Sequence, residues 1–306
     1  MKSGLSAKHF HDEEKAFSYV EARVWPDGPV CPHCGGYERI SKMQGQSTRM
    51  GLYKCYQCRK PFTVRMGTIF ESSKVPLHIW LQAMYLIAGS KKGISSNQLA
   101  RTLGLTVKTA WFLSHRIREA MREGGLAPFG AEGGAVEVDE TYIGRKKGMP
   151  IKGAYHHKMA VLGLVDRDSG RCRMFHVDKA SGANIQPIVL ENLSREARLM
   201  TDENYMYRRI GREFAEHSAV KHYDNEYVRG DVTTNTVEGA FSIFKRGMRG
   251  VYQHCAEKHL HRYLAEFEFR YSHRDANGCN DAARADRILK GVVGKRLTYQ
   301  PALTRA

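Results

Sequence analysis

Two cysteine pairs at fixed spacing constrain the fold of this chain more than any other feature. Two residues separate Cys31 from Cys34 and Cys55 from Cys58, and 20 residues lie between the pairs. Two thiolates on one tight turn can chelate a tetrahedral metal ion, and a second such turn completes a four-sulfur shell. A redox role would need a thioredoxin-like βαβ pattern, which the flanking sequence lacks. The spacing therefore predicts a zinc ribbon with structural Zn²⁺.

No segment has the pattern of a membrane span or an export signal. The most apolar window, residues 80–89, ends at Ser90-Lys91-Lys92, well short of the roughly 18 residues that a spanning helix needs. The first 15 residues hold no apolar stretch of signal-peptide length. We therefore expect a cytoplasmic protein without membrane contact, in which the three scattered cysteines, Cys172, Cys255 and Cys279, stay reduced.

A strong basic excess indicates a polyanionic partner. The 306 residues carry a net charge of +16, and the excess is denser in the first 125 residues. Such a balance favours nucleic acid, although a merely basic or ribosome-associated protein has the same composition. Hydrophobic residues make up 42% of the chain, which excludes a mostly disordered protein. The length predicts about two domains.

Three helices with a sharp turn are predicted between residues 77 and 122. They cover residues 77–90, 95–104 and 107–122, with Gly104 ending the second helix and Thr106 capping the third. This pattern is typical of a helix-turn-helix, and a helical bundle without a DNA role is the alternative. Near the start of the third helix we expect DNA contacts from Lys108 and Thr109. Phosphate contacts are expected from Lys91, Lys92, Arg101, Arg116 and Arg118.

The second half has the pattern of an α/β domain. A Gly- and Ala-rich linker at residues 124–135 precedes strand-like segments at 135–144, 158–168 and 171–178. A helix around 184–193, an apolar run at 197–202 and a helical stretch through 214 follow. A long helix begins near 235. This order predicts a mixed sheet covered by helices.

Three acidic residues of this half stand out from their contexts. Asp139 lies on a strand, Asp202 ends an apolar run, and Glu238 lies on the long helix, two turns before Lys245. Cleavage of a phosphodiester by two divalent ions needs oxygen ligands that converge from several elements. The set predicts a catalytic site for two Mg²⁺ or Mn²⁺ ions. Glu140 is expected to point to the opposite face of the strand.

The ribbon, the helix-turn-helix and the motifs VDETYIGRKK, TD, NTVEGAFSIFKRG and HLHRYLAEFEFRYSHR together resemble insertion-sequence transposases of the ISXO type. The resemblance covers roughly residues 12–300. It implies an RNase H-like fold whose metal-binding triad is Asp139, Asp202 and Glu238. Lys245, with the adjacent Arg246, would contact DNA. Some members carry Asn as the third residue, so Asn235 is the alternative, but the 35 residues between Asp202 and Glu238 favour Glu238.

The same resemblance implies a bacterial, nucleoid-associated DNA transposase. It would bind terminal inverted repeats, cleave DNA and join the 3′-hydroxyl to target DNA as a homodimer or larger assembly. Arg145-Lys146-Lys147 is either a solvated turn or a phosphate-binding patch, and its position beside the first aspartate favours phosphate. The alternatives are a zinc-dependent transcription regulator and a nuclease that cuts without joining.

The expected domains are an N-terminal helix, a zinc ribbon, a helix-turn-helix, a linker, an RNase H-like α/β catalytic domain with a mixed sheet, and a basic tail. Their respective bounds are 1–28, 29–70, 71–124, 125–135, 136–274 and 275–306.

Overall fold

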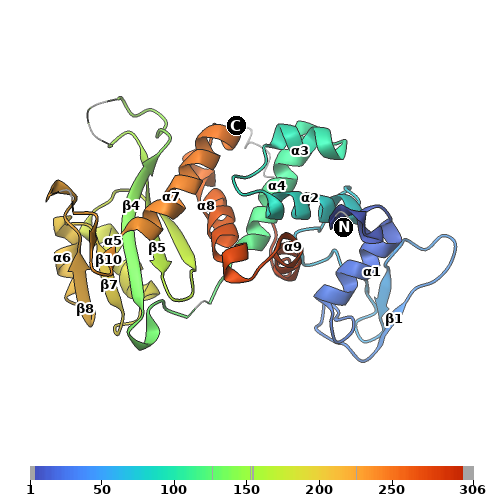
Figure 1. The fold of residues 1–306 in the computed structure, drawn as a ribbon. Helices are drawn as coiled ribbons and strands as arrows, with labels where there is room; N and C mark the ends of the chain where they lie inside the picture. The colour runs from blue at the N-terminus through green and yellow to red at the C-terminus, as the bar shows by residue number, and fades with distance from the viewer. Residues whose placement is uncertain (1–3, 126, 152, 154, 225, 299–306) are drawn as a thin grey trace, which may run out of the picture. The chain divides into compact units, whose positions relative to one another are not determined.

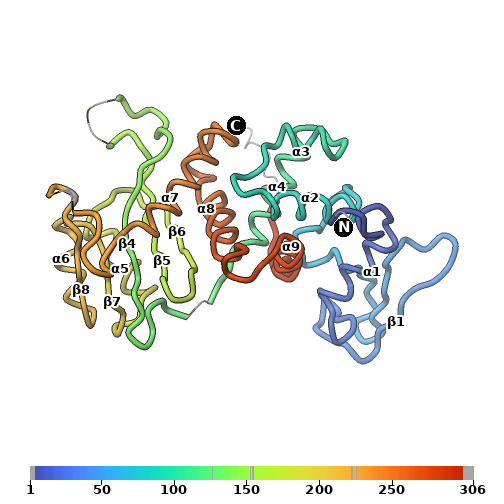
Figure 2. Tube along the Cα trace, viewed as in Figure 1, coloured from blue at the N-terminus to red at the C-terminus, as the bar shows by residue number. Residues whose placement is uncertain are grey.

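The computed structural model describes residues 4–125, 127–151, 153, 155–224 and 226–298. The chain forms two compact units (Figure 2). The first comprises the described residues up to Ser90, Ile94–Arg122 and those from Asn280 onward, and the second comprises Lys91–Gly93 and Glu123–Cys279. The segment from Asn280 therefore returns to the N-terminal unit, which differs from the separate basic tail expected from the sequence.

The first unit opens with short helices η1 (Gly4–Ser6) and η2 (Lys8–Phe10), followed by α1 (Glu13–Val24). The Asp12 side chain caps α1 by accepting a hydrogen bond from the Lys15 N–H. Strands β1 (Ile40–Lys42), β2 (Tyr53–Cys55) and β3 (Pro61–Phe62) then form an antiparallel sheet in that order. Phe62, Cys31 and Cys55 are buried together, so the two turns that carry the cysteines form part of a small core.

Helices α2 (Leu77–Gly89), α3 (Ser96–Leu103), α4 (Val107–Met121) and α9 (Asp281–Lys290) complete the first unit. Ser95 caps α3, Thr106 caps α4, and Gly104 lies between them with φ of +64°, a conformation that favours glycine. The predicted helix-turn-helix is therefore present in α3 and α4. Helix α9 packs against α2 and buries Ile288 and Leu289, so it belongs to this core.

The second unit is built on a five-stranded sheet in the order β6-β5-β4-β7-β8. The bounds are β4 (Ala135–Ile143), β5 (Met159–Asp166), β6 (Cys172–Val177), β7 (Arg198–Thr201) and β8 (Glu216–Ala219). Strands β4, β5 and β6 pair antiparallel, whereas β4, β7 and β8 pair parallel. This is the expected mixed sheet of an RNase H-like fold. A hairpin of β9 (Val228–Arg229) and β10 (Val232–Thr233) precedes α7.

Helices cover both faces of this sheet (Figure 1). On one face, α5 (Gly182–Asn192) and α6 (Tyr205–Gly211) pack on Val136 and Val138. On the other, α7 (Asn235–Gly247), its extension η5 (Met248–Tyr252) and α8 (Glu257–Ser272) pack on Val161. Short helices η3 (Ala131–Gly133), η4 (His222–Asp224) and η6 (Asp275–Asn277) lie in the connections. Alternate residues of β4 therefore face α7.

Part of the expected linker belongs to the second core. Phe129 is buried, forms an isolated bridge with Leu193, and has the Arg173 guanidinium 4.1 Å from its ring centroid. The residues around Phe129 are rich in Gly and Ala, which is typical of a linker. The Phe129 ring nevertheless packs into the core, because burying it removes much apolar surface from water. Residue 126, also within that linker, lies outside the described residues.

No helix in the described ranges is both long and apolar enough to cross a membrane.

Candidate functional site

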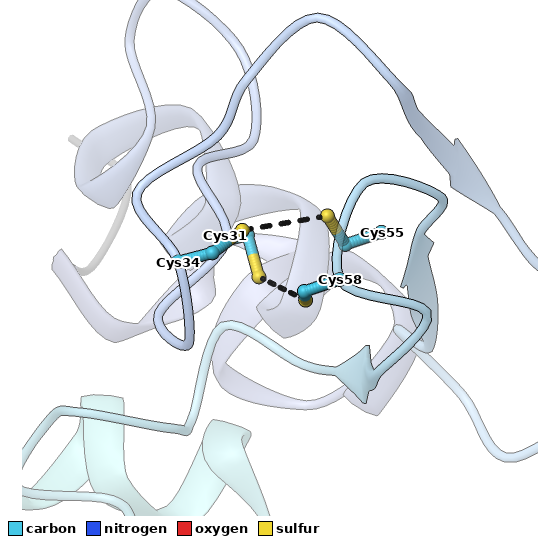
Figure 3. Close-up of side chains that lie close together, drawn as sticks. All are labelled: Cys31, Cys34, Cys55 and Cys58. Atoms are coloured by element: carbon cyan, nitrogen blue, oxygen red, sulfur yellow. Dashed lines mark hydrogen bonds between the residues drawn. The ribbon is translucent and has the colours of Figure 1, made fainter.

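The four cysteines form a compact cluster between two chain turns (Figure 3). Their sulfur atoms all lie within 4.8 Å of one another, with Cys31 and Cys58 3.6 Å apart and Cys34 and Cys55 3.7 Å apart. A tetrahedral ion with Zn–S bonds of about 2.3 Å separates its sulfur ligands by about 3.8 Å. The two printed sulfur–sulfur distances are close to this value, so the cluster suits tetrahedral Zn²⁺.

Backbone donors prepare one of these thiols for a metal. Hydrogen bonds from the Cys58 N–H and then the Gln57 N–H lower the pKa of Cys55 to about 7, against the effect of burial. A lowered pKa favours the thiolate, which is the form that binds metal. His33 is exposed, and its ring nitrogen lies 3.3 Å from the Pro61 carbonyl oxygen. It thus lies outside the sulfur shell.

The sheet register brings two of the predicted carboxylates together. Glu137 on β4 pairs with Met200 on β7 in a parallel ladder. Two residues further along each strand direction come Asp139 and Asp202, so both stand at the same end of this ladder. Asp139 also pairs with Gly163 of β5. The prediction that these acids lie on neighbouring strands agrees with this register.

The third carboxylate comes from the helix above the sheet. Glu238 lies in the first turn of α7, and the Thr234 hydroxyl donates a hydrogen bond of 2.8 Å to it. A cleft of about 670 Å³ separates β4 from α7 and its extension. Both acidic and basic side chains line it, the charged residues being Asp139, Glu140, Glu238, Lys245, Arg246 and Arg249.

Burial, together with the crowding of carboxylates, raises the pKa of Asp139 to about 8. Burial is the largest cause, the nearby charges of Glu140, Asp202 and Glu238 add to it, and a hydrogen bond from the Glu140 N–H opposes it. Like charges held close together favour the protonated form. All three predicted acids are thus close enough to interact electrostatically, and a bound cation would relieve their repulsion.

The cations that line the cleft are similarly crowded. Burial lowers the pKa of Lys245, as do Arg249 and Lys158, whereas Asp139 and Glu238 raise it. Lys245 therefore lies near both acids, as its spacing of two helical turns from Glu238 predicts. Sequence reasoning did not single out Lys158 or Arg249, because their places beside Lys245 depend on tertiary packing.

Glu140 is among the residues that line the cleft, but its carboxylate is held by Asn204 and Tyr207 at the start of α6. Its two oxygens accept hydrogen bonds of 2.7 Å from the Tyr207 hydroxyl and 3.2 Å from the Asn204 side-chain amide. The Asn204 backbone N–H donates to Asp202 at 3.1 Å. Glu140 is thus engaged with α6. Asn204 and Tyr207 were missed, because only the fold places them here.

The alternative third residue lies outside the lining of the cleft. Asn235 is the exposed first residue of α7, and its backbone N–H donates to the Thr233 hydroxyl. Just after it, the buried carboxylate of Glu137 accepts hydrogen bonds from Thr236 and Val237. This arrangement favours Glu238 over Asn235.

The expected DNA contacts of the first unit divide into two groups. Arg101 and Lys108 are exposed, and Thr109 is partly buried with its hydroxyl 2.8 Å from that of Thr106. Arg116 is 4% exposed and donates to the Glu71 carbonyl oxygen, and burial lowers its pKa to about 10. Arg118 is also buried. Both arginines are buried, so their guanidinium groups are withdrawn from the surface.

The basic segment after β4, Arg145-Lys146-Lys147, uses two of its side chains in hydrogen bonds to backbone carbonyl groups. Arg145 donates to the Met149 carbonyl oxygen, and the Lys146 ammonium donates to the Asp178 carbonyl oxygen at 2.6 Å. Arg145 and Lys147 are exposed.

Asp139, Asp202 and Glu238 offer the oxygen ligands that hard cations prefer. Their carboxylates are, however, more widely spaced than the cysteine sulfur atoms. In the part of the chain that the structure describes, the cysteines form the one group with three or more potential ligands within 4.8 Å of one another. Carboxylates that share two ions about 3.5–4 Å apart need not meet so closely. Asp139, Asp202 and Glu238 could therefore hold two Mg²⁺ or Mn²⁺ ions, since both prefer oxygen ligands.

Comparison with known proteins identifies two domains in this chain. Residues 132–272 match the ISXO2-like transposase domain, and residues 11–61 match the transposase zinc-ribbon domain. An uncharacterized protein in transposable element ISH50 of Halobacterium salinarum is 28% identical over 285 residues, spanning 87% of this chain and 93% of that protein.

Among solved structures, the simian T-cell lymphotropic virus intasome in complex with PP2A regulatory subunit B56 gamma has a similar chain. The likeness covers 56% of this chain and 63% of that one, at 15% identity and a TM-score of 0.31, which is below that of proteins sharing a fold. The two matched domains together span more than half of the sequence. The chain therefore belongs to the family of ISXO2-like insertion-sequence transposases.

Proposed function

We propose that this protein binds the terminal inverted repeats of a mobile element, cleaves the DNA there and joins the released 3′-hydroxyl to target DNA at the nucleoid. The observation that carries the proposal is the electrostatic coupling of Asp139 with Asp202 and Glu238 beside a cleft with cationic walls. Holding these acids together reduces the stability of the folded chain. This favours a role in binding cations over a role as solvated surface charges.

Each charged group of the cleft has a role in this proposal. Asp139, Asp202 and Glu238 hold two divalent ions. When bound, those ions activate the attacking oxygen and neutralise charge on the leaving oxygen. Lys245, Arg246 and Arg249 also line the cleft and bind DNA phosphates, which orients the scissile bond.

The first unit supplies the DNA recognition. Lys108 is exposed in the first turn of α4, and Arg101 is exposed on α3, so both are accessible to DNA. We infer that α4 enters the major groove, while Zn²⁺ bound by the four cysteines stabilises the ribbon. Because two element ends must be joined, the active form is a homodimer or larger assembly on DNA.

A strand-transfer assay tests the proposal. The full chain is incubated with Mg²⁺, oligonucleotides carrying the element's ends and a supercoiled plasmid. Joined products should form with the natural protein and disappear with Asp139→Asn, Asp202→Asn and Glu238→Gln, whereas Asn235→Ala should retain them. Sequence-specific binding with no cleavage would favour a transcription regulator, and cleavage without joining would favour a nuclease. Loss of activity in Asn235→Ala but not in Glu238→Gln would refute the site assignment.

A further inference from the structure

One buried acid of β4 lies close to the cleft without lining it. Glu137 is 0% exposed and lies two residues before Asp139, on the same face of the strand. A fully buried carboxylate is costly unless its oxygens are hydrogen-bonded. The partners of Glu137 therefore indicate what it does.

Those partners are the first donors of α7. One oxygen of Glu137 accepts the N–H groups of Thr236 at 2.8 Å and Val237 at 2.9 Å, and the other accepts the Thr236 hydroxyl at 2.8 Å. Helix α7 begins at Asn235, so these N–H groups have no partner within the helix. A carboxylate at this position also interacts favourably with the helix dipole. Glu137 is thus a cap supplied by the sheet rather than by the helix itself.

This cap fixes the distance between two proposed metal ligands. Glu238 directly follows the capped Val237, and Asp139 follows Glu137 by two residues on the same strand face. Gly163, the β5 partner of Asp139, lets the helix lie close, because a Cβ there would come within 2.6 Å of the Phe241 ring. A shift of the first turn of α7 would therefore move Glu238 relative to Asp139.

Arg167 links the Glu137 carboxylate to β7. The Arg167 Nε lies 3.7 Å from a Glu137 oxygen. Its Nη1 lies 3.2 Å from the Met200 sulfur and donates to the Asp231 carbonyl oxygen. Met200 lies on β7, two residues before Asp202. Glu137 and Arg167 thus connect the three elements that carry the acids.

We propose that Glu137 is a positioning residue that sets the spacing of the catalytic carboxylates by capping α7 from β4. This inference rests on the proposed metal-binding role of Asp139, Asp202 and Glu238. Groups that orient metal ligands typically contribute a factor of 10 to 100 in metal affinity. The proposal therefore predicts a loss of metal affinity that a general loss of stability would not cause.

The test measures Mn²⁺ binding to the zinc-loaded full chain by electron paramagnetic resonance, without DNA. Glu137→Gln keeps the size of the side chain but presents an amide where the helix offers N–H donors. It should raise the Mn²⁺ Kd about tenfold or more. The matched control is Glu13→Gln, because Glu13 also caps a helix, accepting the Leu77 and His78 N–H groups at 2.8 and 3.0 Å at the start of α2. The control should bind Mn²⁺ as the natural protein does.

Asp139→Asn separates the two possible failures. If the natural protein binds Mn²⁺ no better than Asp139→Asn, the proposed metal site is wrong. If the natural protein binds Mn²⁺ better than Asp139→Asn does, and Glu137→Gln binds Mn²⁺ as tightly as the natural protein, only the positioning role is wrong. Should Glu137→Gln fail to fold, Thr236→Val, which removes one of the three hydrogen bonds, is expected to raise the Kd about threefold, and an unchanged Kd would overturn the proposal.

Discussion

Replacing Asp139 with Asn should stabilise the metal-free protein, although it removes a proposed ligand. The pKa of this carboxyl is about 8 in the folded chain, against an ordinary value of 3.8. Between these values the folded state keeps a proton that the unfolded state has lost, so stability falls as pH rises through this window. Asn is uncharged throughout, and its oxygen can still accept the Glu140 N–H, which lies 2.7 Å from an Asp139 oxygen.

The expected gain follows from the width of that window. Each pH unit above the unfolded-state pKa costs about 1.4 kcal/mol, so the penalty at pH 7 is roughly 4 kcal/mol. For a unit of this size, 1 kcal/mol corresponds to about 2–4 °C in Tm. Asp139→Asn should therefore raise the Tm of the second unit by about 10 °C at pH 7.

Differential scanning calorimetry with a chelator-free, Mg²⁺-free buffer at several pH values measures this effect. The difference in Tm between the two proteins should shrink towards zero below pH 3.8, where the carboxyl is protonated in both the folded and the unfolded state of the natural protein. Added Mg²⁺ should stabilise the natural protein at pH 8 and leave the variant unchanged. A variant that is no more stable than the natural protein at pH 8 would refute the idea that the carboxylates are held together against repulsion.

Three further predictions concern the other parts of the molecule. Cys34→Ser should abolish binding of one Zn²⁺ per chain, measured by metal analysis, and lower the Tm of the first unit only. Lys245→Ala should weaken DNA binding and reduce the slope of log affinity against log salt by about one, as followed by fluorescence anisotropy. Gly163→Val should destabilise the second unit by about 1–3 kcal/mol in urea, since its Cβ would meet the Phe241 ring at 2.6 Å. Gly239→Ala, where a Cβ would meet nothing within 4 Å, is the control and should not lose stability.

The local patterns of the sequence predicted most of the fold. The alternation around Asp139 fixed which residues of β4 face α7, and Gly104 between two capped helices predicted the helix-turn-helix. Strand β8 (Glu216–Ala219) was missed because this partly exposed edge strand has no apolar alternation. Its pairing with β7 depends on the completed sheet, which no local pattern contains.

The candidate site was predictable in its acids but not in their supports. Asp139, Asp202 and Glu238 carry recognisable contexts, whereas Asn204 and Tyr207 act through contacts that only the folded chain creates. Arg116 was misplaced, although the sequence held the signal. It lies three residues after Leu113 and four before Ala120, on the apolar stripe of its helix.

Two acids on one face of β4 show how environment separates structure from chemistry. Burial raises the pKa of Glu137, but hydrogen bonds from Val237 and Thr236, together with Arg167, oppose that rise. Asp139 is surrounded by like charges, and among the described residues one hydrogen bond, from the Glu140 N–H, is made to it. Because the first carboxylate is already satisfied by donors, a cation would gain little there. The second has free lone pairs and repelling neighbours, so a cation bound beside it gains both ligands and relief of repulsion.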